Sequence, residues 1–185
     1  MFEEGKKRAM EKLKIRGADE EIKNILERIN SSDFFYTTSS CSGRISLLLI
    51  PEIGSKREAK FLGKWHGTPN VEEVMELIKK PEKGEVWLIY QSPILHVVCR
   101  DTKRAIELLR KAYSSGFKYS SIKGISEERV IVEILSTERM HVPLGKDGFL
   151  FCNEEYLNFI LERADIMLSR GKEKLKRFYS TISSP

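Results

Sequence analysis

Short apolar runs with strand-like composition outnumber the helical segments between them, and this feature constrains the fold most. Many of these runs follow one another with only a turn between them: residues 34–38, 44–50, 58–66, 85–90, 94–100, 117–123, 129–136 and 140–144. A doubly wound parallel sheet needs a crossover helix between successive strands, so this order argues against one. The sequence therefore predicts an α+β fold with a mixed or largely antiparallel sheet.

Five segments are predicted to be helices, and all but the first follow a capping residue and have apolar residues at helical spacing. They are residues 2–15, the segment after Asp19, the segment after Asn70, the segment after Asp101, and a long C-terminal helix from Asn153 toward Ser180. Residues 71–100 and 101–144 both start with a capped helix and continue with strands, an order that fits an internal duplication. Because their residues match poorly, we expect one domain over residues 1–185, with any pseudo-repeated halves inside it.

Composition limits where the protein can work. At 41% hydrophobic residues the chain can bury a core, which excludes wholesale disorder. The longest apolar runs, 45–50 and 94–99, are far shorter than the roughly 20 residues that span a bilayer. The first six residues contain no apolar signal core. These features predict a soluble cytoplasmic protein with no membrane partner.

The net charge of +5 is concentrated at the two ends. Residues 1–16 carry a net charge of +3 and residues 170–185 a net charge of +4, so the body between them is mildly acidic. Positive charge gathered on one element is typical of phosphate binding. Two solvated helix faces are the alternative, and the sequence leaves both open.

Residues 37–44, Thr-Thr-Ser-Ser-Cys-Ser-Gly-Arg, form the most informative segment. Small hydroxyl side chains and backbone N–H groups near a glycine can seat an anion or a polar ligand. Arg44 adds a planar fork for a carboxylate or a phosphate. A hydroxyl-rich turn without a ligand is the alternative. Cys41 has no base beside it in sequence, which favours a small buried thiol over a nucleophile.

The remaining candidates are single residues without a diagnostic motif. No nucleotide-binding glycine motif, metalloprotease motif or zinc-type cysteine spacing is present. His66, His96 and His141 could bind a metal only if the fold brought them together, and His96 inside an apolar strand also fits a core histidine. Trp65, which lies beside basic residues, could stack on a base or belong to the core.

Several segments, in order along nearly the whole chain, resemble the tRNA wybutosine-synthesizing protein 3 family. They are Asp33 with Phe35 and the string TTSSCSGRI at 37–45, ILHVVCR at 94–100, SGFK at 115–118 with Ser121-Ile122, VPL at 142–144, and the closing helix from 154–156 to 177–179. The string TTSSCSGR is the most specific of these.

The resemblance implies an S-adenosyl-L-methionine-dependent methyltransferase with a fold of its own. Family members methylate the N4 ring nitrogen of a 4-demethylwyosine-type tricyclic base (7-aminocarboxypropyl-demethylwyosine) next to the anticodon of phenylalanine tRNA. Methyl transfer from a sulfonium to a nitrogen is an in-line displacement that needs positioning and a proton acceptor, and no metal is expected. The basic ends would then grip tRNA.

Matching the family's motifs to this sequence suggests a role for each candidate residue. Ser39, Ser40, Ser42, Gly43 and Arg44 are expected to hold the amino-acid end of the cofactor or a phosphate. Asp33 and His96 are the expected catalytic proton acceptors or orienting residues. Trp65, Arg100 and Lys118 are the expected substrate contacts. A non-catalytic tRNA-binding module is the first alternative, and a structural protein whose hydroxyl-rich turns serve only folding is the second.

Overall fold

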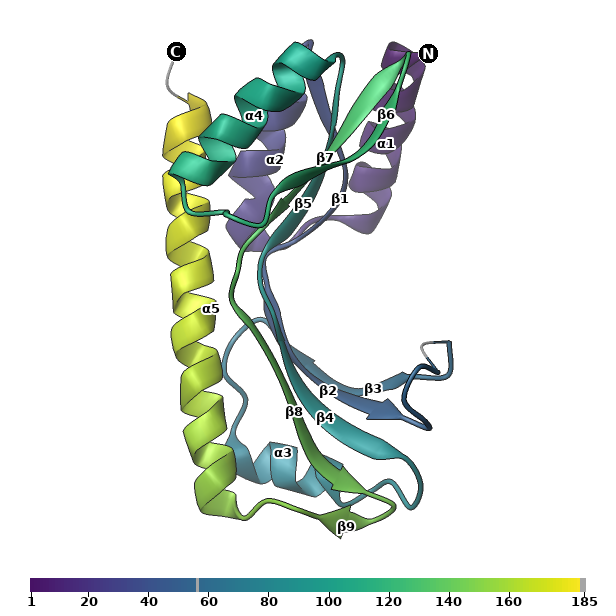
Figure 1. The fold of residues 1–185 in the computed structure, drawn as a ribbon, viewed down its shortest axis with the longest axis vertical. Helices are drawn as coiled ribbons and strands as arrows, with labels where there is room; N and C mark the ends of the chain where they lie inside the picture. The colour runs from purple at the N-terminus through teal and green to yellow at the C-terminus, as the bar shows by residue number, and fades with distance from the viewer. Residues whose placement is uncertain (56, 184–185) are drawn as a thin grey trace. The chain divides into compact units, whose positions relative to one another are not determined.

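The computed structural model describes residues 1–55 and 57–183, and the chain forms two compact units (Figure 1). Unit 1 consists of Met1–Ser42, Pro93–Thr137 and Gly171–Pro185, and unit 2 consists of Gly43–Ser92 and Glu138–Arg170. The chain passes back and forth between them, so neither unit is a continuous stretch of sequence. None of the described helices combines the length and the apolar character needed to cross a bilayer.

Unit 1 is built around a four-stranded antiparallel sheet in the order β1-β5-β7-β6. Its strands are β1 (Phe35–Cys41), β5 (Ile94–Cys99), β6 (Ser121–Ser126) and β7 (Arg129–Leu135). Its helices are α1 (Phe2–Arg16), the short 3₁₀ helix η1 (Glu20–Ile22), α2 (Lys23–Asn30), α4 (Thr102–Ser114) and the last part of α5 (Glu154–Ser183).

Alternation along β5 and β7 gives the sheet of unit 1 one apolar face. Leu95, Val97 and Cys99 of β5, together with Val130, Val132 and Ile134 of β7, are buried against α2, α4 and the end of α5. Phe117 lies edge-on to Phe178 of α5, with ring centroids 5.8 Å apart. This face is therefore the hydrophobic core of the unit.

Helix α1 packs against the other face of the same sheet (Figure 1). Phe2 meets Tyr36 of β1 edge-on at 5.0 Å, and α1 itself has no fully buried residue. Because side chains alternate along a strand, His96 of β5 and Glu133 of β7 also lie on this second face. The second face is thus where polar chemistry can be placed in unit 1.

Unit 2 contains a second antiparallel sheet in the order β3-β2-β4-β8-β9. Its strands are β2 (Arg44–Ile50), β3 (Lys60–Trp65), β4 (Glu85–Gln91), β8 (Arg139–Lys146) and β9 (Phe149–Leu150). Helix α3 (Val71–Ile78) and the first part of α5 supply the other half of its core. Tyr90 donates its hydroxyl to the Met167 carbonyl at 2.9 Å, and burial raises the pKa of that phenol.

The predicted fold class is confirmed, namely α+β with antiparallel sheets and a long C-terminal helix. Asn70, Asp101 and Asn153 each accept a backbone N–H as helix caps, as predicted. The predicted capping role of Asp19 is wrong, because its side chain makes no cap hydrogen bond. The helix-then-strands order does recur in α3-β4-β5 and α4-β6-β7, but β6 pairs with β7 whereas β4 and β5 lie in different sheets.

Candidate active site

A β-bulge in β1 determines which hydroxyl faces His96. Tyr36 lies opposite Val98 and Thr37 opposite Val97, but the register then shifts so that Ser39 lies opposite His96. Thr38 is the extra residue of the bulge. Residues directly opposite each other in an antiparallel pair point to the same side of the sheet. The bulge therefore places the side chain of Ser39 on the face that carries His96.

Four polar side chains form a continuous chain of contacts across all four strands of unit 1. Ser39 Oγ lies 2.9 Å from His96 Nδ1, and His96 Nε2 lies 3.1 Å from Glu133 Oε2. Lys123 Nζ of β6 lies 2.7 Å from the other carboxylate oxygen, Oε1. The side chain of Glu133 is only 12% exposed and that of His96 is 30% exposed. Both ring nitrogens of His96 thus have a hydrogen-bond partner, and the ring is still partly exposed to solvent.

The ionisation of Glu133 sets the direction of these hydrogen bonds. Partial burial acts to raise its pKa, but the hydrogen bond and charge of Lys123, helped by His96, outweigh burial and hold the pKa below its usual value. An ionised carboxylate only accepts hydrogen bonds, so His96 Nε2 carries a proton toward it. In the neutral imidazole, Nδ1 is then the acceptor of the hydrogen bond that the Ser39 hydroxyl donates. The nitrogen of His96 without a proton therefore points toward Ser39.

Arg44, at the start of β2 in unit 2, retains capacity for an anion. Its Nε donates to Gln91 Oε1 at 2.9 Å, and its guanidinium centre lies 5.5 Å from the centre of the Phe61 ring. Among the described residues, Gln91 is the acceptor for this guanidinium, so its other N–H groups can bind a ligand. Gly43 before it has a φ of 97°, a conformation that favours glycine.

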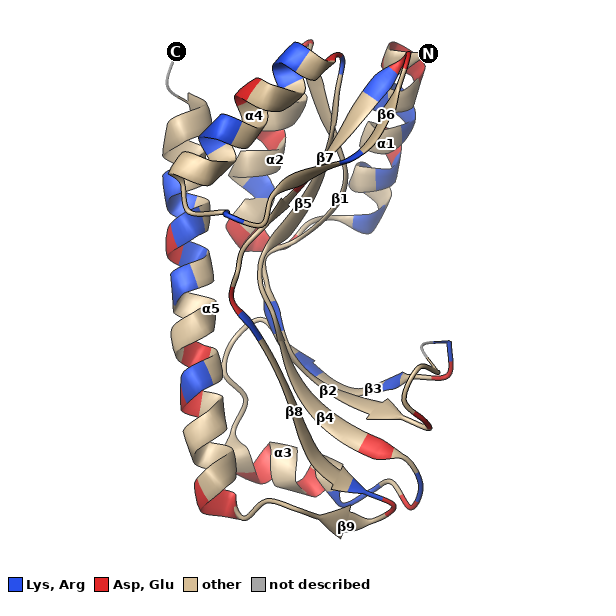
Figure 2. Cartoon of the chain, in the orientation of Figure 1, with Lys and Arg blue, Asp and Glu red and all other residues tan. Residues whose placement is uncertain are grey.

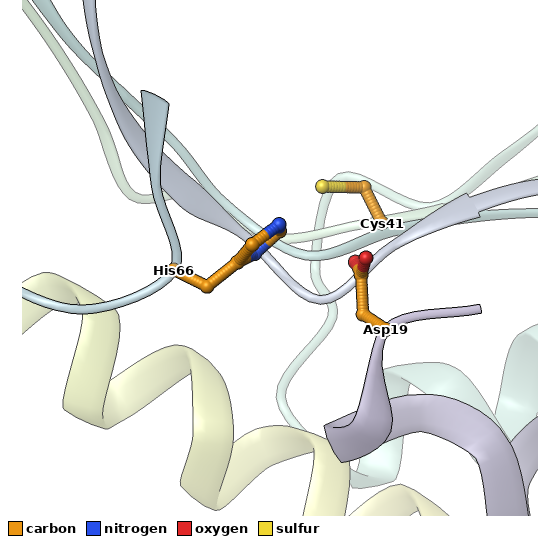
Figure 3. Close-up of side chains that lie close together, drawn as sticks. All are labelled: Asp19, Cys41 and His66. Carbon is orange, nitrogen blue, oxygen red and sulfur yellow. The ribbon is translucent and has the colours of Figure 1, made fainter. Parts of the chain in front are cut away.

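Asp19, Cys41 and Ser42 lie close together in unit 1. Asp19 Oδ2 accepts the backbone N–H of Ser42 at 2.7 Å, and its carboxylate lies within 4.8 Å of Cys41 Sγ. Figure 3 shows these two side chains, and it also labels His66 of unit 2, whose Nδ1 lies 2.9 Å from the Gly43 carbonyl. The predicted segment 37–44 therefore gains a carboxylate that its own sequence does not contain.

Asp33 and Arg100 lie near the opposite end of β1 from Ser39. The Asp33 carbonyl accepts from Arg100 Nε at 3.2 Å, and the Arg100 guanidinium also pairs with Glu3 and lies 4.7 Å from the centre of the Phe2 ring. Asp33 lies in the turn before β1, and the four steps of strand from Phe35 to Ser39 correspond to roughly 13 Å. The structure does not bring Asp33 beside His96.

Trp65 and Lys118 differ in how far they are available to a ligand. The Trp65 indole N–H donates to Glu73 Oε1 at 3.1 Å, and its ring lies directly over Gly63, where a Cβ would come within 2.0 Å of it. These contacts are those of a packing residue. Lys118, by contrast, is exposed in the turn before β6. Base stacking by Trp65 and substrate binding by Lys118 both stay predictions.

Comparisons with known proteins agree with this architecture over the whole chain. The family model described as Methyltransferase TYW3 matches residues 4–184. This chain belongs to the TYW3 methyltransferase family.

Relatives within the family are similar from end to end. A Pyrococcus horikoshii protein named tRNA(Phe) 7-((3-amino-3-carboxypropyl)-4-demethylwyosine(37)-N(4))-methyltransferase 1 is 50% identical, with 99% of this chain and 95% of the relative aligned. A protein of the same name from Pyrococcus furiosus is 49% identical with the same coverage. A solved structure of a Pyrococcus horikoshii protein superposes with a TM-score of 0.93 at 49% identity, covering 100% of this chain and 97% of the other.

In this member of the TYW3 methyltransferase family, the two basic segments have different surroundings. Figure 2 shows Lys and Arg along α1 and along the last part of α5. Three cations of α5 are tied within unit 1: Lys172 pairs with Glu21 at 3.3 Å, Lys174 donates to Ser136 Oγ at 2.6 Å, and Arg177 donates to the Ser115 carbonyl at 3.4 Å. In unit 1, α1 contacts β1, whereas Leu175 and Phe178 of α5 belong to the hydrophobic core.

Sequence reasoning missed Glu133, Lys123 and Asp19 as site residues. The signal for Glu133 was present, because it is the one charged residue inside the apolar run of β7, on the side opposite Val132 and Ile134. Lys123 and Asp19 carried no such signal, since their partners lie ten and twenty-three residues away along the chain.

Proposed function

We propose that this protein methylates the N4 ring nitrogen of 7-aminocarboxypropyl-demethylwyosine at position 37 of phenylalanine tRNA, using S-adenosyl-L-methionine. Membership of the TYW3 methyltransferase family and the names of relatives at 49–50% identity support the reaction. The observation that carries the mechanism is the contact chain Ser39–His96–Glu133–Lys123. We further propose that residues 1–185 act as one methyltransferase domain, in the cytoplasm, where tRNA is processed.

The residues present fit a methyl donor with an amino-acid end. The Arg44 guanidinium has N–H groups available for a carboxylate, and the adjacent Ser42 and Gly43 were predicted to assist it. When bound, S-adenosyl-L-methionine supplies the methyl group from its sulfonium, and the sulfur that loses this group becomes a neutral thioether.

The target nitrogen of the substrate carries a proton that must leave when the nitrogen–methyl bond forms. The Ser39 oxygen can accept this proton while its own hydroxyl proton passes to His96 Nδ1, so the proton ends on the imidazole. The imidazolium formed in this way is stabilised by the Glu133 carboxylate at Nε2. Lys123 lowers the pKa of that carboxylate further below its usual value. A positioned general base of this kind contributes a factor of about 10²–10⁴.

Substrate recognition is proposed to involve the exposed residues predicted from the motifs. Lys118 can contact a phosphate or the side-chain carboxylate of the base, because its ammonium is exposed. Arg100 could do so only by sharing its guanidinium with Glu3, to which it is paired. Trp65 would contact the substrate only with the outer edge of its ring, because the ring also packs over Gly63.

Single-turnover methylation of tRNA from cells blocked at the preceding step tests this assignment. His96→Gln and Ser39→Ala should slow methyl transfer at saturating tRNA and donor by about 10²-fold or more, since they remove the base or its relay. Asp33→Asn serves as the matched control and should keep the wild-type rate. Wild-type rates in both His96→Gln and Ser39→Ala would refute the proposed mechanism, whereas a loss confined to Asp33→Asn would transfer the role to Asp33. Firm tRNA binding with no donor binding would support the non-catalytic module.

A further inference from the structure

A groove lies between α1 and β1 in unit 1. The motifs assign two of its strand residues, Ser39 and Ser40, to the amino-acid end of the cofactor or a phosphate, but neither the motifs nor the relatives' names assign a role to its α1 side. We call it the α1–β1 groove; it is lined on the helix by Lys12, Leu13 and Arg16 and on the strand by residues 37–40. Its volume is about 220 Å³. Lys12 and Arg16 are exposed, and neither has a partner among the described residues. Two cations without a charged partner therefore line the groove across from Thr38, Ser39 and Ser40, whereas the hydroxyl of Thr37 is buried and bonded to Asn30.

The chemistry of this lining selects an anion that carries no positive charge of its own. Among the residues that the structure describes, none that lines the groove has an acidic side chain. S-adenosyl-L-methionine carries an ammonium and a sulfonium besides its carboxylate, so two cations would repel most of the molecule. A phosphodiester carries only negative charge and offers two acceptor oxygens to guanidinium, ammonium and hydroxyl donors. The groove thus suits a nucleic-acid backbone better than the methyl donor.

The groove also adjoins the candidate catalytic residues. Ser39 lines it and at the same time lies 2.9 Å from His96 Nδ1. A nucleotide whose base reaches His96 would therefore have its own or a neighbouring phosphate beside Lys12 and Arg16. Gly17 at the end of α1 has a φ of 72°, which turns the chain away immediately after Arg16.

We propose that the α1–β1 groove binds a backbone phosphate of the tRNA next to the base that is methylated, with Lys12 and Arg16 as the charged contacts. This inference rests on the proposed function for the identity of the nucleic acid. According to this proposal, α1 supplies the charged contacts to the tRNA near the base that is methylated. The cations of α5 that are paired inside unit 1 would then serve mainly the fold.

Binding of an unmodified phenylalanine tRNA transcript, measured between about 50 and 200 mM salt, tests the proposal. The double variant Lys12→Gln/Arg16→Gln should weaken binding at least about tenfold and reduce the slope of log affinity against log salt by about 2. The matched control is Lys7→Gln/Lys14→Gln, which removes two exposed α1 cations outside the groove. It should weaken binding less than about threefold.

Several outcomes would overturn the proposal. Equal losses in the two double variants would show that α1 acts only through diffuse charge, and an unchanged affinity of Lys12→Gln/Arg16→Gln would exclude the groove. Titration of the same variants with S-adenosylhomocysteine should give wild-type affinity; a loss there with tRNA binding intact would assign the groove to the methyl donor. Because the transcript lacks the tricyclic base, these results do not depend on whether methyl transfer occurs.

Discussion

Replacing Glu133 by Gln should slow methyl transfer without weakening tRNA binding. The substitution keeps the shape of the side chain but removes the charge that lies 3.1 Å from His96 Nε2. At that separation two unit charges attract by about 1.3 kcal/mol in water and about 5 kcal/mol at an effective dielectric constant of 20. The site lies between these limits, because His96 is 30% exposed and Lys123 already offsets part of the carboxylate charge.

A net loss of about 1–2 kcal/mol in stabilisation of the imidazolium is therefore expected. It corresponds to a rate that is about 5–30-fold lower. Single-turnover methylation at saturating tRNA measures this rate, and a separate binding titration measures the affinity. The hydrogen bond is present beforehand, but the attraction between the two opposite charges exists only once the proton has been transferred, so the rate should fall and the affinity should not.

Lys123→Met is the matched control for Glu133→Gln. Lys123 is half exposed, so its loss should change the rate by less than about threefold while the carboxylate still faces His96. A wild-type rate for Glu133→Gln, or equal losses in both variants, would refute the argument that the carboxylate acts through His96.

Three further predictions concern stability and reactivity. Phe117→Ala should lower the free energy of unfolding by about 3–5 kcal/mol in urea titrations, because it removes a fully buried ring that packs on Phe178; a loss below about 1 kcal/mol would contradict this packing role. Wild type should be more stable than Glu133→Gln, with the full difference above pH 4.5 and a smaller one as the pH falls through the lowered pKa of Glu133 in the folded protein. Thermal unfolding of both proteins at neutral and acidic pH measures this difference. A difference that grows in acid would contradict the prediction. Cys99, whose pKa is raised to about 12 mainly by burial and further by Asp101, should be the last of the three cysteines alkylated in the native state, with mass spectrometry of partly modified protein as the check.

Most of the secondary structure could be predicted from the sequence, because apolar patterns and capping residues are local signals. β2 begins and ends at the predicted Arg44 and Ile50, and three predicted caps make their hydrogen bonds. Asp19 looked like a fourth cap for the same local reason. Its carboxylate instead accepts the N–H of Ser42, a contact that depends on the tertiary fold.

The candidate site was only partly predictable. His96 and Ser39 were singled out by their motifs, but their proximity depends on the strand order of unit 1 and on the bulge at Thr38. Without the bulge, alternation along β1 would put Thr38 or Ser40 on the face of His96. Glu133 completes the site through the pairing of β5 with β7, which no local pattern specifies.

The mass of the nucleoside at position 37 tests the central claim most directly. Phenylalanine tRNA carrying the demethylated tricyclic base would be incubated with the protein and S-adenosyl-L-methionine, digested, and analysed by mass spectrometry. We predict a gain of one methyl group on the tricyclic base, located at its N4 ring nitrogen by fragmentation. An unchanged nucleoside mass, from protein that binds both the donor and this tRNA, would contradict the proposed function.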